Sequence, residues 1–196
     1  MVGKQAKVFS PRELRQLMTA AIAGRFPERD RLIVLLAARA GLRACEIANL
    51  TWGMVLDASG RVAPLIEVRG SIAKRGSGRR VPMHMQLRRA LRDWKCNQPD
   101  HRITHDAVIV TSLRGGPMRP NSIVNWFVTR CREADLEGCS SHSGRRTFIT
   151  NAARRAHRAG ASLRDVQMLA GHRSIETTQG YIDGDSDAQR RLVSLI

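Results

Sequence analysis

The sequence predicts a mainly helical α+β domain with a small antiparallel sheet of three strands. Apolar residues recur at helical spacing over most of the chain, and capping boxes precede two of these segments. Between residues 54 and 85 the pattern changes to short apolar runs separated by turn residues, which is typical of strands. The hydrophobic share of 42% is enough for a core. We therefore expect residues 1–196 to form a single domain.

The first two helices are predicted from their ends. Ser10–Glu13 has the form of a capping box, with proline in the first helical position. A second helix over about residues 28–40 is strongly apolar from Leu32 to Ala38 and ends at Gly41. Because one helix carries so many apolar residues on all sides, we expect it at the centre of the domain.

The remaining elements follow in order. Residues 43–49 resemble a short helix, and residues 54–85 are expected to form three strands with turns at 57–60 and 75–78. Acidic residues at 183, 185 and 187 precede an apolar end, so residues 183–196 are expected to dock on another surface. Further helices are expected over residues 87–94, 120–134, 144–159, 162–170 and 175–181.

The chain carries a large positive charge. Its formal net charge is +16 and its pI is near 11.4, which exceeds what solubility requires and predicts a polyanionic partner, with nucleic acid first. Four of the 33 basic residues are lysines, which leaves 29 arginines. Arginine binds phosphate through a planar fork, although a preference for arginine codons would explain most of these positions equally well. Charge alone therefore predicts binding and not chemistry.

Other classes of protein are disfavoured. The longest apolar run, Leu32–Ala38, is too short to cross a bilayer, and a cytoplasmic location is expected. The four cysteines contain no Cys-x-x-Cys pair, which argues against a zinc ribbon and against a disulfide framework. His101 and His105 could share a helix face, but the nearby Pro99 argues against a metal site. We expect neither a metal nor a cofactor.

Four segments, taken together and in this order, resemble the catalytic domain of the tyrosine recombinase (phage integrase) family. They are Ala40–Ile47, the predicted hairpin around Lys74, His142–Thr147, and Leu169–His172 followed nine residues later by Tyr181. Any one of them is a weak signal, whereas the ordered set is specific and spans most of the chain. The resemblance implies the fold of that catalytic domain. It also implies site-specific cleavage and rejoining of double-stranded DNA through a covalent 3′-phosphotyrosyl intermediate.

The residue types in these segments suit attack on a phosphodiester. Attack builds negative charge on the non-bridging oxygens, which preorganised cations must meet. Arg43 and Arg145 can do so with charge-assisted bidentate hydrogen bonds. Tyr181, the only tyrosine, is the predicted nucleophile. Because a tyrosine hydroxyl ordinarily has a pKa of about 10, it needs a partner for its proton, and His142 is the expected base or hydrogen-bond partner.

Three further residues complete the predicted site. His172, by resemblance, donates a hydrogen bond to the scissile phosphate. Lys74 is the expected general acid for the leaving 5′ oxygen, because arginine does not release its proton. The alternative for Lys74 is an ordinary basic residue in a DNA-facing loop. Glu46 is expected to orient a guanidinium or to cap locally. Arginines beside these motifs are expected to contact DNA: Arg75, Arg79, Arg80, Arg146 and Arg173.

The resemblance implies that the catalytic part begins almost at the start of this sequence. Most members of the family carry a further N-terminal helical domain that closes over the DNA, so the chain resembles the short members. Holding a DNA site is then expected to need several protomers, assembled as a tetramer on paired sites. Residues 183–196 are expected to dock on a neighbouring subunit, or alternatively on their own chain.

Other functions remain open alternatives. A DNA invertase would use the same chemistry, and a type IB topoisomerase would use the same residues without exchanging partner strands. A DNA-binding regulator that does not cleave is disfavoured, because all six expected positions carry competent side chains. The target sequence and the direction of the reaction are not encoded in these motifs.

Overall fold

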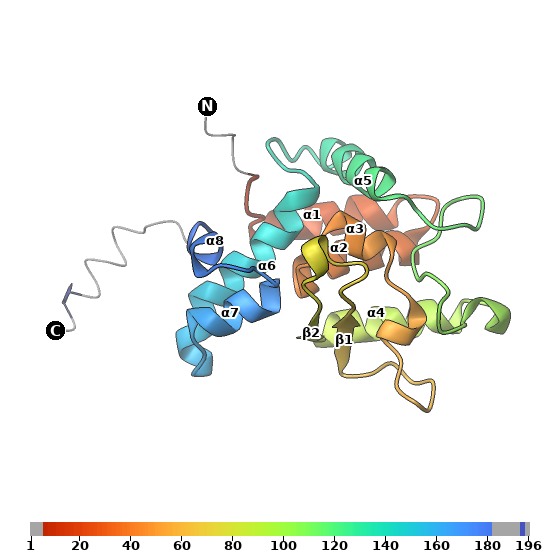
Figure 1. Ribbon diagram of the computed structural model, residues 1–196. Coiled ribbons are helices and arrows are strands. Elements are labelled where there is room, and N and C mark those ends of the chain that lie inside the picture. The colour runs from red at the N-terminus through yellow and green to blue at the C-terminus, as the bar shows by residue number, and fades with distance from the viewer. Residues whose placement is uncertain (1–5, 182–192, 195–196) are drawn as a thin grey trace.

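Helices make up most of the computed structural model, which describes residues 6–181 and 193–194 (Figure 1). Every helix predicted from the sequence has a counterpart in it. The α-helices are α1 (Pro11–Ile22), α2 (Pro27–Ala40), α3 (Ala44–Ala48), α4 (Met85–Cys96), α5 (Pro120–Glu133), α6 (Ser141–Ala156), α7 (Leu163–Ala170) and α8 (Ile175–Gln179). The strands are β1 (Leu65–Val68) and β2 (Arg79–Pro82).

The ends of the helices show how local sequence fixes them. The Ser10 side chain accepts a hydrogen bond from the Glu13 N–H, and the Glu13 carboxylate accepts one from the Ser10 N–H at 2.8 Å, as the predicted capping box requires. A second capping box at Ser162 begins α7. Helix α2 ends at Gly41, whose φ of +64° favours glycine. A Cβ on Gly41 would also collide with the Phe148 ring.

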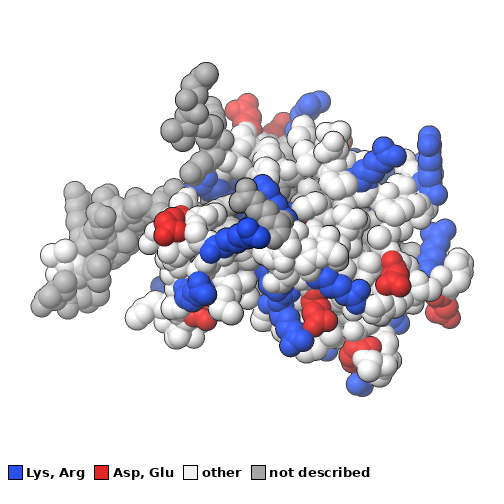
Figure 2. Space-filling model, in the orientation of Figure 1, with Lys and Arg blue, Asp and Glu red and all other residues white. Residues whose placement is uncertain are grey.

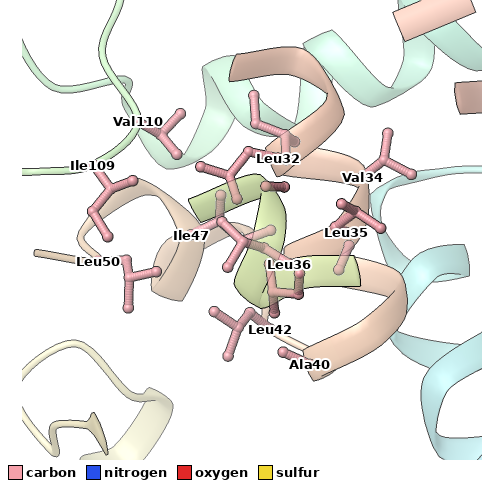
Figure 3. Packing of buried hydrophobic residues seen from close by; sticks show 14 of the residues in the cluster. Leu32, Val34, Leu35, Leu36, Ala40, Leu42, Ile47, Leu50, Ile109 and Val110 are labelled. Carbon is pink, nitrogen blue, oxygen red and sulfur yellow. The ribbon is translucent and has the colours of Figure 1, made fainter. Parts of the chain in front are cut away.

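Helix α2 is the central helix, as predicted. Its residues from Leu32 to Ala38 are at most 4% exposed, and the helix packs against α1, α4 and α6. Figure 3 shows Leu32 and Leu36 meeting side chains from other segments, among them Ile47 of α3 and Val110. Fully burying one such side chain contributes about 1.5–3 kcal/mol. This apolar frame holds the helices that carry the predicted site residues.

The sheet has two strands, so the predicted third strand is wrong. Strands β1 and β2 pair antiparallel, with Ile66 opposite Val81 and both side chains fully buried. The segment before β1 instead forms a 3₁₀ turn at Trp52–Met54 and a single isolated bridge between Leu56 and Val62. The strand-like composition of this segment is therefore not sufficient for it to pair as a third strand.

Asp57 gives the physical reason for the missing strand. Its Oδ1 accepts hydrogen bonds from the N–H groups of Ser59 and Arg61, at 3.0 and 2.9 Å. Gly60 follows in the left-handed conformation, with a φ of +73°. Aspartate and glycine together reverse the chain within a few residues. The two flanking segments then separate after one bridge.

Helices α6, α7 and α8 form one side of the molecule (Figure 1). A small apolar cluster joins Ile149 of α6 to Val166 and Ala170 of α7, and Tyr181 packs against it just after α8. Gly144 lies where α6 crosses α2, and a Cβ on it would lie 2.7 Å from the Cβ of Ala37. The glycine therefore permits the close approach of the helix that carries His142 and Arg145 to the central helix.

Two further expectations concern the ends and the membrane. The predicted docking segment, residues 183–196, falls outside the described residues except at Val193 and Ser194, so its docking stays a prediction. Over residues 6–181 and 193–194, none of the helices combines the length and the apolar character that crossing a bilayer demands.

Candidate active site

Arg145 lies at the centre of the predicted site. It comes from the second turn of α6 and is only 4% exposed. Its Nη1 donates to the carbonyl of Gly41 at 2.6 Å, and its Nη2 donates to the carbonyl of Ala170 at 2.7 Å. These carbonyls belong to the C-terminal ends of α2 and α7, where the helix itself leaves acceptors unpaired. Arg145 therefore ties two helix ends together around its own guanidinium.

Positive charge accumulates around Arg145. Its pKa falls from the usual 12.5 to about 10, first because of burial and then because of the cations Arg43 and Arg79. The group remains a cation at neutral pH. Neighbouring like charges destabilise one another, and an anion placed among them would relieve that repulsion. Binding of an anionic group at this site would therefore be electrostatically favourable.

His172 is held as a neutral imidazole. Arg145 Nη2 lies 3.0 Å from His172 Nε2, and because arginine can only donate, Nε2 must be the acceptor. The proton of the neutral ring is then on Nδ1, which lies 3.0 Å from the Thr178 hydroxyl. Burial first, and then Arg145, Arg43 and Arg79, lower the pKa of His172 from 6.5 to about 4. At neutral pH this histidine adds no charge to the site.

Tyr181 lies beside His172. The two rings stack with their centroids 5.3 Å apart and their planes 27° from parallel. The Thr150 hydroxyl of α6 donates to the carbonyl of Tyr181 at 3.0 Å, which fixes the backbone just after α8. The predicted nucleophile is therefore adjacent to the predicted phosphate ligands His172 and Arg145, although these residues are far apart in the sequence.

Glu46 of α3 is fully buried and binds two arginines. Arg79 forms a bidentate pair with it, from Nη1 to Oε1 at 2.8 Å and from Nη2 to Oε2 at 2.9 Å. Arg43 donates its backbone N–H to Oε2 at 2.8 Å and its Nη1 to Oε1 at 3.0 Å. Burial opposes ionisation of Glu46, but the hydrogen bonds and charges of Arg79 and then Arg43 outweigh it and lower its pKa. Glu46 both caps α3 and orients guanidinium groups.

Lys74 lies on the connection between the two strands. It begins a short 3₁₀ turn, Lys74–Gly76, and its side chain is exposed. Ala73 beside it is buried, and the Ser77 hydroxyl donates to the Lys74 carbonyl at 3.0 Å. Among the described residues, no hydrogen bond or ion pair joins the Lys74 amino group to the rest of the site. Its role as the general acid stays a prediction.

His142 is exposed in the first turn of α6. It lines a pocket of about 890 Å³ that Tyr181, Arg146 and Lys7 also line. The His142 ring and Tyr181 thus face one space, but no hydrogen bond between them occurs among the described residues. The exchange of a proton between these two side chains stays a prediction.

The five arginines expected to contact DNA have different surroundings. Arg80 is exposed and pairs with Glu67 at 2.8 Å, and Arg173 is exposed between α7 and α8. Arg146 is buried at 9% exposure. The Arg75 side chain lies outside the described part of the structure. The Arg79 side chain is only 5% exposed, so the structure places it as a partner of Glu46 and not as an exposed DNA contact.

Sequence reasoning missed the residues that position His172 and the arginines. Thr178 is fully buried against His172, and the Gln167 side chain donates to the His172 carbonyl at 3.0 Å. A weak signal exists for Gln167, because it lies on the same face of α7 as Ala170. Arg79 carries no local signal, since its partner Glu46 lies 33 residues earlier.

Comparison with known proteins identifies the family and the fold. The profile described as the phage integrase family matches residues 7–187. The tyrosine recombinase XerC of Myxococcus xanthus is 32% identical over 161 residues, which cover 78% of this chain and 49% of the relative. The tyrosine recombinase XerD of Ralstonia nicotianae is 36% identical over 160 residues, covering 78% and 47%. The chain spans about half the length of these curated relatives.

Solved structures show the same fold. The crystal structure of XerA recombinase superposes with a TM-score of 0.73 at 25% identity, covering 96% of this chain and 64% of that one. The Tn1549 transposon integrase, solved with a circular intermediate DNA, superposes with a TM-score of 0.78 at 17% identity, covering 100% and 67%. Because the family profile covers nearly all of the sequence, this chain belongs to the phage integrase family.

Proposed function

We propose that this chain is the catalytic part of a site-specific DNA recombinase, which cuts and rejoins strands through a 3′-phosphotyrosyl intermediate. The observation that carries the proposal is the contact series of Tyr181, His172 and Arg145. Tyr181 stacks on His172, and His172 accepts a hydrogen bond from the buried Arg145. His172 thereby links the proposed nucleophile to a fixed cation, which supports phosphoryl transfer at this site.

Two arginines supply the charge for the scissile phosphate. The guanidinium of Arg43 is partly exposed, and that of Arg145 is buried. Both are held by contacts within the chain. Charge that develops on the non-bridging oxygens then meets cations whose positions are already fixed, so that only hydrogen bonds need to be exchanged. Removal of one such preorganised donor costs about 10²–10³ in rate in comparable sites.

Strand cleavage is an in-line transfer of the phosphoryl group. The phenolic oxygen of Tyr181 forms a bond to phosphorus as the bond from phosphorus to the 5′ oxygen breaks. In our proposal the phenolic proton passes to His142, which shares a pocket with Tyr181, and Lys74 gives a proton to the 5′ oxygen. The products are a 3′-phosphotyrosyl strand and a free 5′ hydroxyl.

His172 must change its hydrogen bonding when DNA enters. In the present structure its Nε2 accepts from Arg145, so it cannot also donate to a phosphate. A phosphate anion would take over the Arg145 N–H and favour a proton on Nε2, because a nearby anion raises the pKa of an imidazole. We propose that His172 becomes a donor to the scissile phosphate in this way.

The partners of the reaction follow from the same proposal. Double-stranded DNA is the substrate, reached in the cytoplasm, and a free 5′ hydroxyl of a second duplex attacks the phosphotyrosyl bond to release Tyr181. Two duplexes with cleavage on each strand require four active sites, which favours a tetramer. The XerH recombinase has been solved bound to its palindromic difH DNA, and this chain has its fold, with a TM-score of 0.76 at 18% identity.

A pool of nicked duplexes with randomised arms tests the proposal without a known target. The nick lets the short cleaved product diffuse away, so that covalent protein–DNA adducts accumulate. We expect adducts enriched in one sequence, and joining of the captured strand to a second duplex that carries the same sequence. Capture without sequence preference, together with relaxation of plasmids and no exchange of strands, would favour the topoisomerase alternative.

A further inference from the structure

Arg79 is a buried cation next to the arginines proposed to bind phosphate. We propose that Arg79 is a positioning residue for strand cleavage, which neutralises Glu46 and so leaves the guanidinium of Arg43 free for the scissile phosphate. This inference rests on the proposed function, because it assigns Arg79 a part in that reaction. It gives Arg79 a task that does not include touching DNA.

The two arginines share Glu46 unequally. Arg79 gives the carboxylate two guanidinium N–H groups in a bidentate fork, at 2.8 and 2.9 Å. Arg43 gives it one guanidinium N–H at 3.0 Å. The Arg43 side chain is 20% exposed, and its other guanidinium nitrogens form no hydrogen bond within the described residues. Arg43 therefore keeps an open edge toward solvent, whereas Arg79 does not.

Arg79 is fixed on its other side as well. Its Nε donates to the carbonyl of Leu169 at 2.9 Å, near the end of α7. Gly171, which follows this helix with a φ of +63°, lies so close that a Cβ on it would be 2.9 Å from Arg79 Cδ. All three guanidinium nitrogens of Arg79 are engaged by the protein. A guanidinium held in this way acts as a fixed counter-ion for Glu46.

The charge of Glu46 explains why a counter-ion is needed. Glu46 is 0% exposed, and a buried carboxylate stays ionised only with charged or hydrogen-bonding partners. Without Arg79, Arg43 would be the remaining arginine on this carboxylate and could form a bidentate pair with it. The carboxylate and the phosphate would then bind the same guanidinium. Arg79 removes this competition.

Single and double variants separate this role from plain stability. We expect Arg79→Met to slow covalent cleavage of a captured nicked duplex by about 10²-fold, because Glu46 then takes up Arg43. Glu46→Gln in the same chain removes the competing charge, and we expect the double variant to recover at least about tenfold. Arg89→Met serves as the matched control. Arg89 is an exposed arginine of α4 that also pairs with a carboxylate, with its Nε 4.0 Å from Oδ2 of Asp93.

A second readout keeps the test valid if Arg79→Met does not fold. The double variant has no unpaired buried charge, and its cleavage rate is expected to match that of Glu46→Gln alone. A neutral methylphosphonate at the scissile position needs less help from Arg43, so the defect of any folded Arg79 variant should shrink on that substrate. A purely structural defect would be the same on both substrates.

The outcomes distinguish this inference from the proposed function. No covalent adduct from the unaltered chain would contradict the proposed function itself. A normal adduct from the unaltered chain, with Arg79→Met equally fast, would contradict only the role of Arg79. A double variant that is folded and about 10²-fold slower than Glu46→Gln would also contradict it, because Arg79 would then act independently of Glu46.

Discussion

His172 has a pKa well below that of an isolated histidine. Its ring is neutral, accepts from Arg145 through Nε2 and faces Thr178 through Nδ1. Burial and the charges of Arg145, Arg43 and Arg79 keep it neutral, and Arg145 and Arg43 are the proposed ligands of the scissile phosphate. The protonation state of His172 is therefore coupled to occupancy of the site.

The titration of His172 predicts an acid sensitivity. Its pKa is 6.5 in the unfolded chain and about 4 in the folded one, so between these values only the unfolded chain binds a proton there. The contribution of neutral His172 to the free energy of unfolding is fully present above pH 6.5 and is lost as the pH drops toward 4. We expect His172→Gln to reduce that loss by about 1 kcal/mol, allowing for partial exposure. Urea unfolding at pH 7 and at pH 4.5 measures this, and an unchanged pH dependence would contradict it.

Lys74 allows a direct test of leaving-group protonation. Lys74→Ala is expected to slow cleavage by about 10²–10⁴-fold, because the 5′ oxygen then leaves without a positioned acid. A substrate with sulfur at the bridging 5′ position needs no such proton, since a thiolate leaves readily. The variant should cleave this substrate at nearly the normal rate. An equal defect with oxygen and sulfur leaving groups would instead place Lys74 in DNA binding.

The contacts of the site were predictable to different degrees. The motifs named Arg145, His172 and Tyr181, and the structure brings these three into contact. Arg79 was expected to contact DNA, and its pairing with Glu46 could not be predicted, because that pairing depends on how β2 meets α3. Residue spacing does not reveal contacts made across the fold, whereas the residues proposed to react belong to recognisable motifs.

Helices were easier to predict than strands for a similar reason. The start of α1 and the end of α2 depend on Ser10, Glu13 and Gly41, which act within one turn of the chain. The number of strands depends on which segments find a partner. Asp57 reverses the chain after a single bridge, and only β1 and β2 find a ladder.

Packing of α6 against α2 predicts an unusual response to alanine. Glycine to alanine inside a helix ordinarily stabilises by about 1 kcal/mol. At Gly144 the added Cβ would lie 2.7 Å from the Cβ of Ala37, and we expect Gly144→Ala to destabilise by about 1–3 kcal/mol. Thermal unfolding measures this. Adding Ala37→Gly should restore part of the loss, and a stabilised Gly144→Ala protein would show that the helices separate freely.

The whole molecule is strongly basic. Figure 2 shows lysine and arginine spread over the face, with fewer acidic side chains between them. The net charge of +16 supports binding to a polyanion over a broad surface, while the motifs predict chemistry at one site. The same charge does not identify individual contacts, since Arg79 is basic and buried.

This charge predicts a steep salt dependence of DNA binding. Each phosphate contact releases condensed counterions, so affinity should fall linearly on a logarithmic scale as salt rises. With roughly 6–10 such contacts, the loss between 50 and 200 mM salt would be about 10³–10⁵-fold. Fluorescence anisotropy with Tyr181→Phe measures binding without covalent capture. An affinity insensitive to salt would contradict a phosphate-dominated interface.

The proposed covalent bond between Tyr181 and DNA offers the most direct test of the central claim. Tyr181 is the only tyrosine, and it stacks on His172 beside Arg145. Adducts trapped on a nicked duplex can be digested and the modified peptide identified by mass spectrometry. We expect the 3′ phosphate on Tyr181, and we expect Tyr181→Phe to bind the duplex without forming an adduct. Equal trapping by both proteins, or an adduct on another residue, would contradict the account.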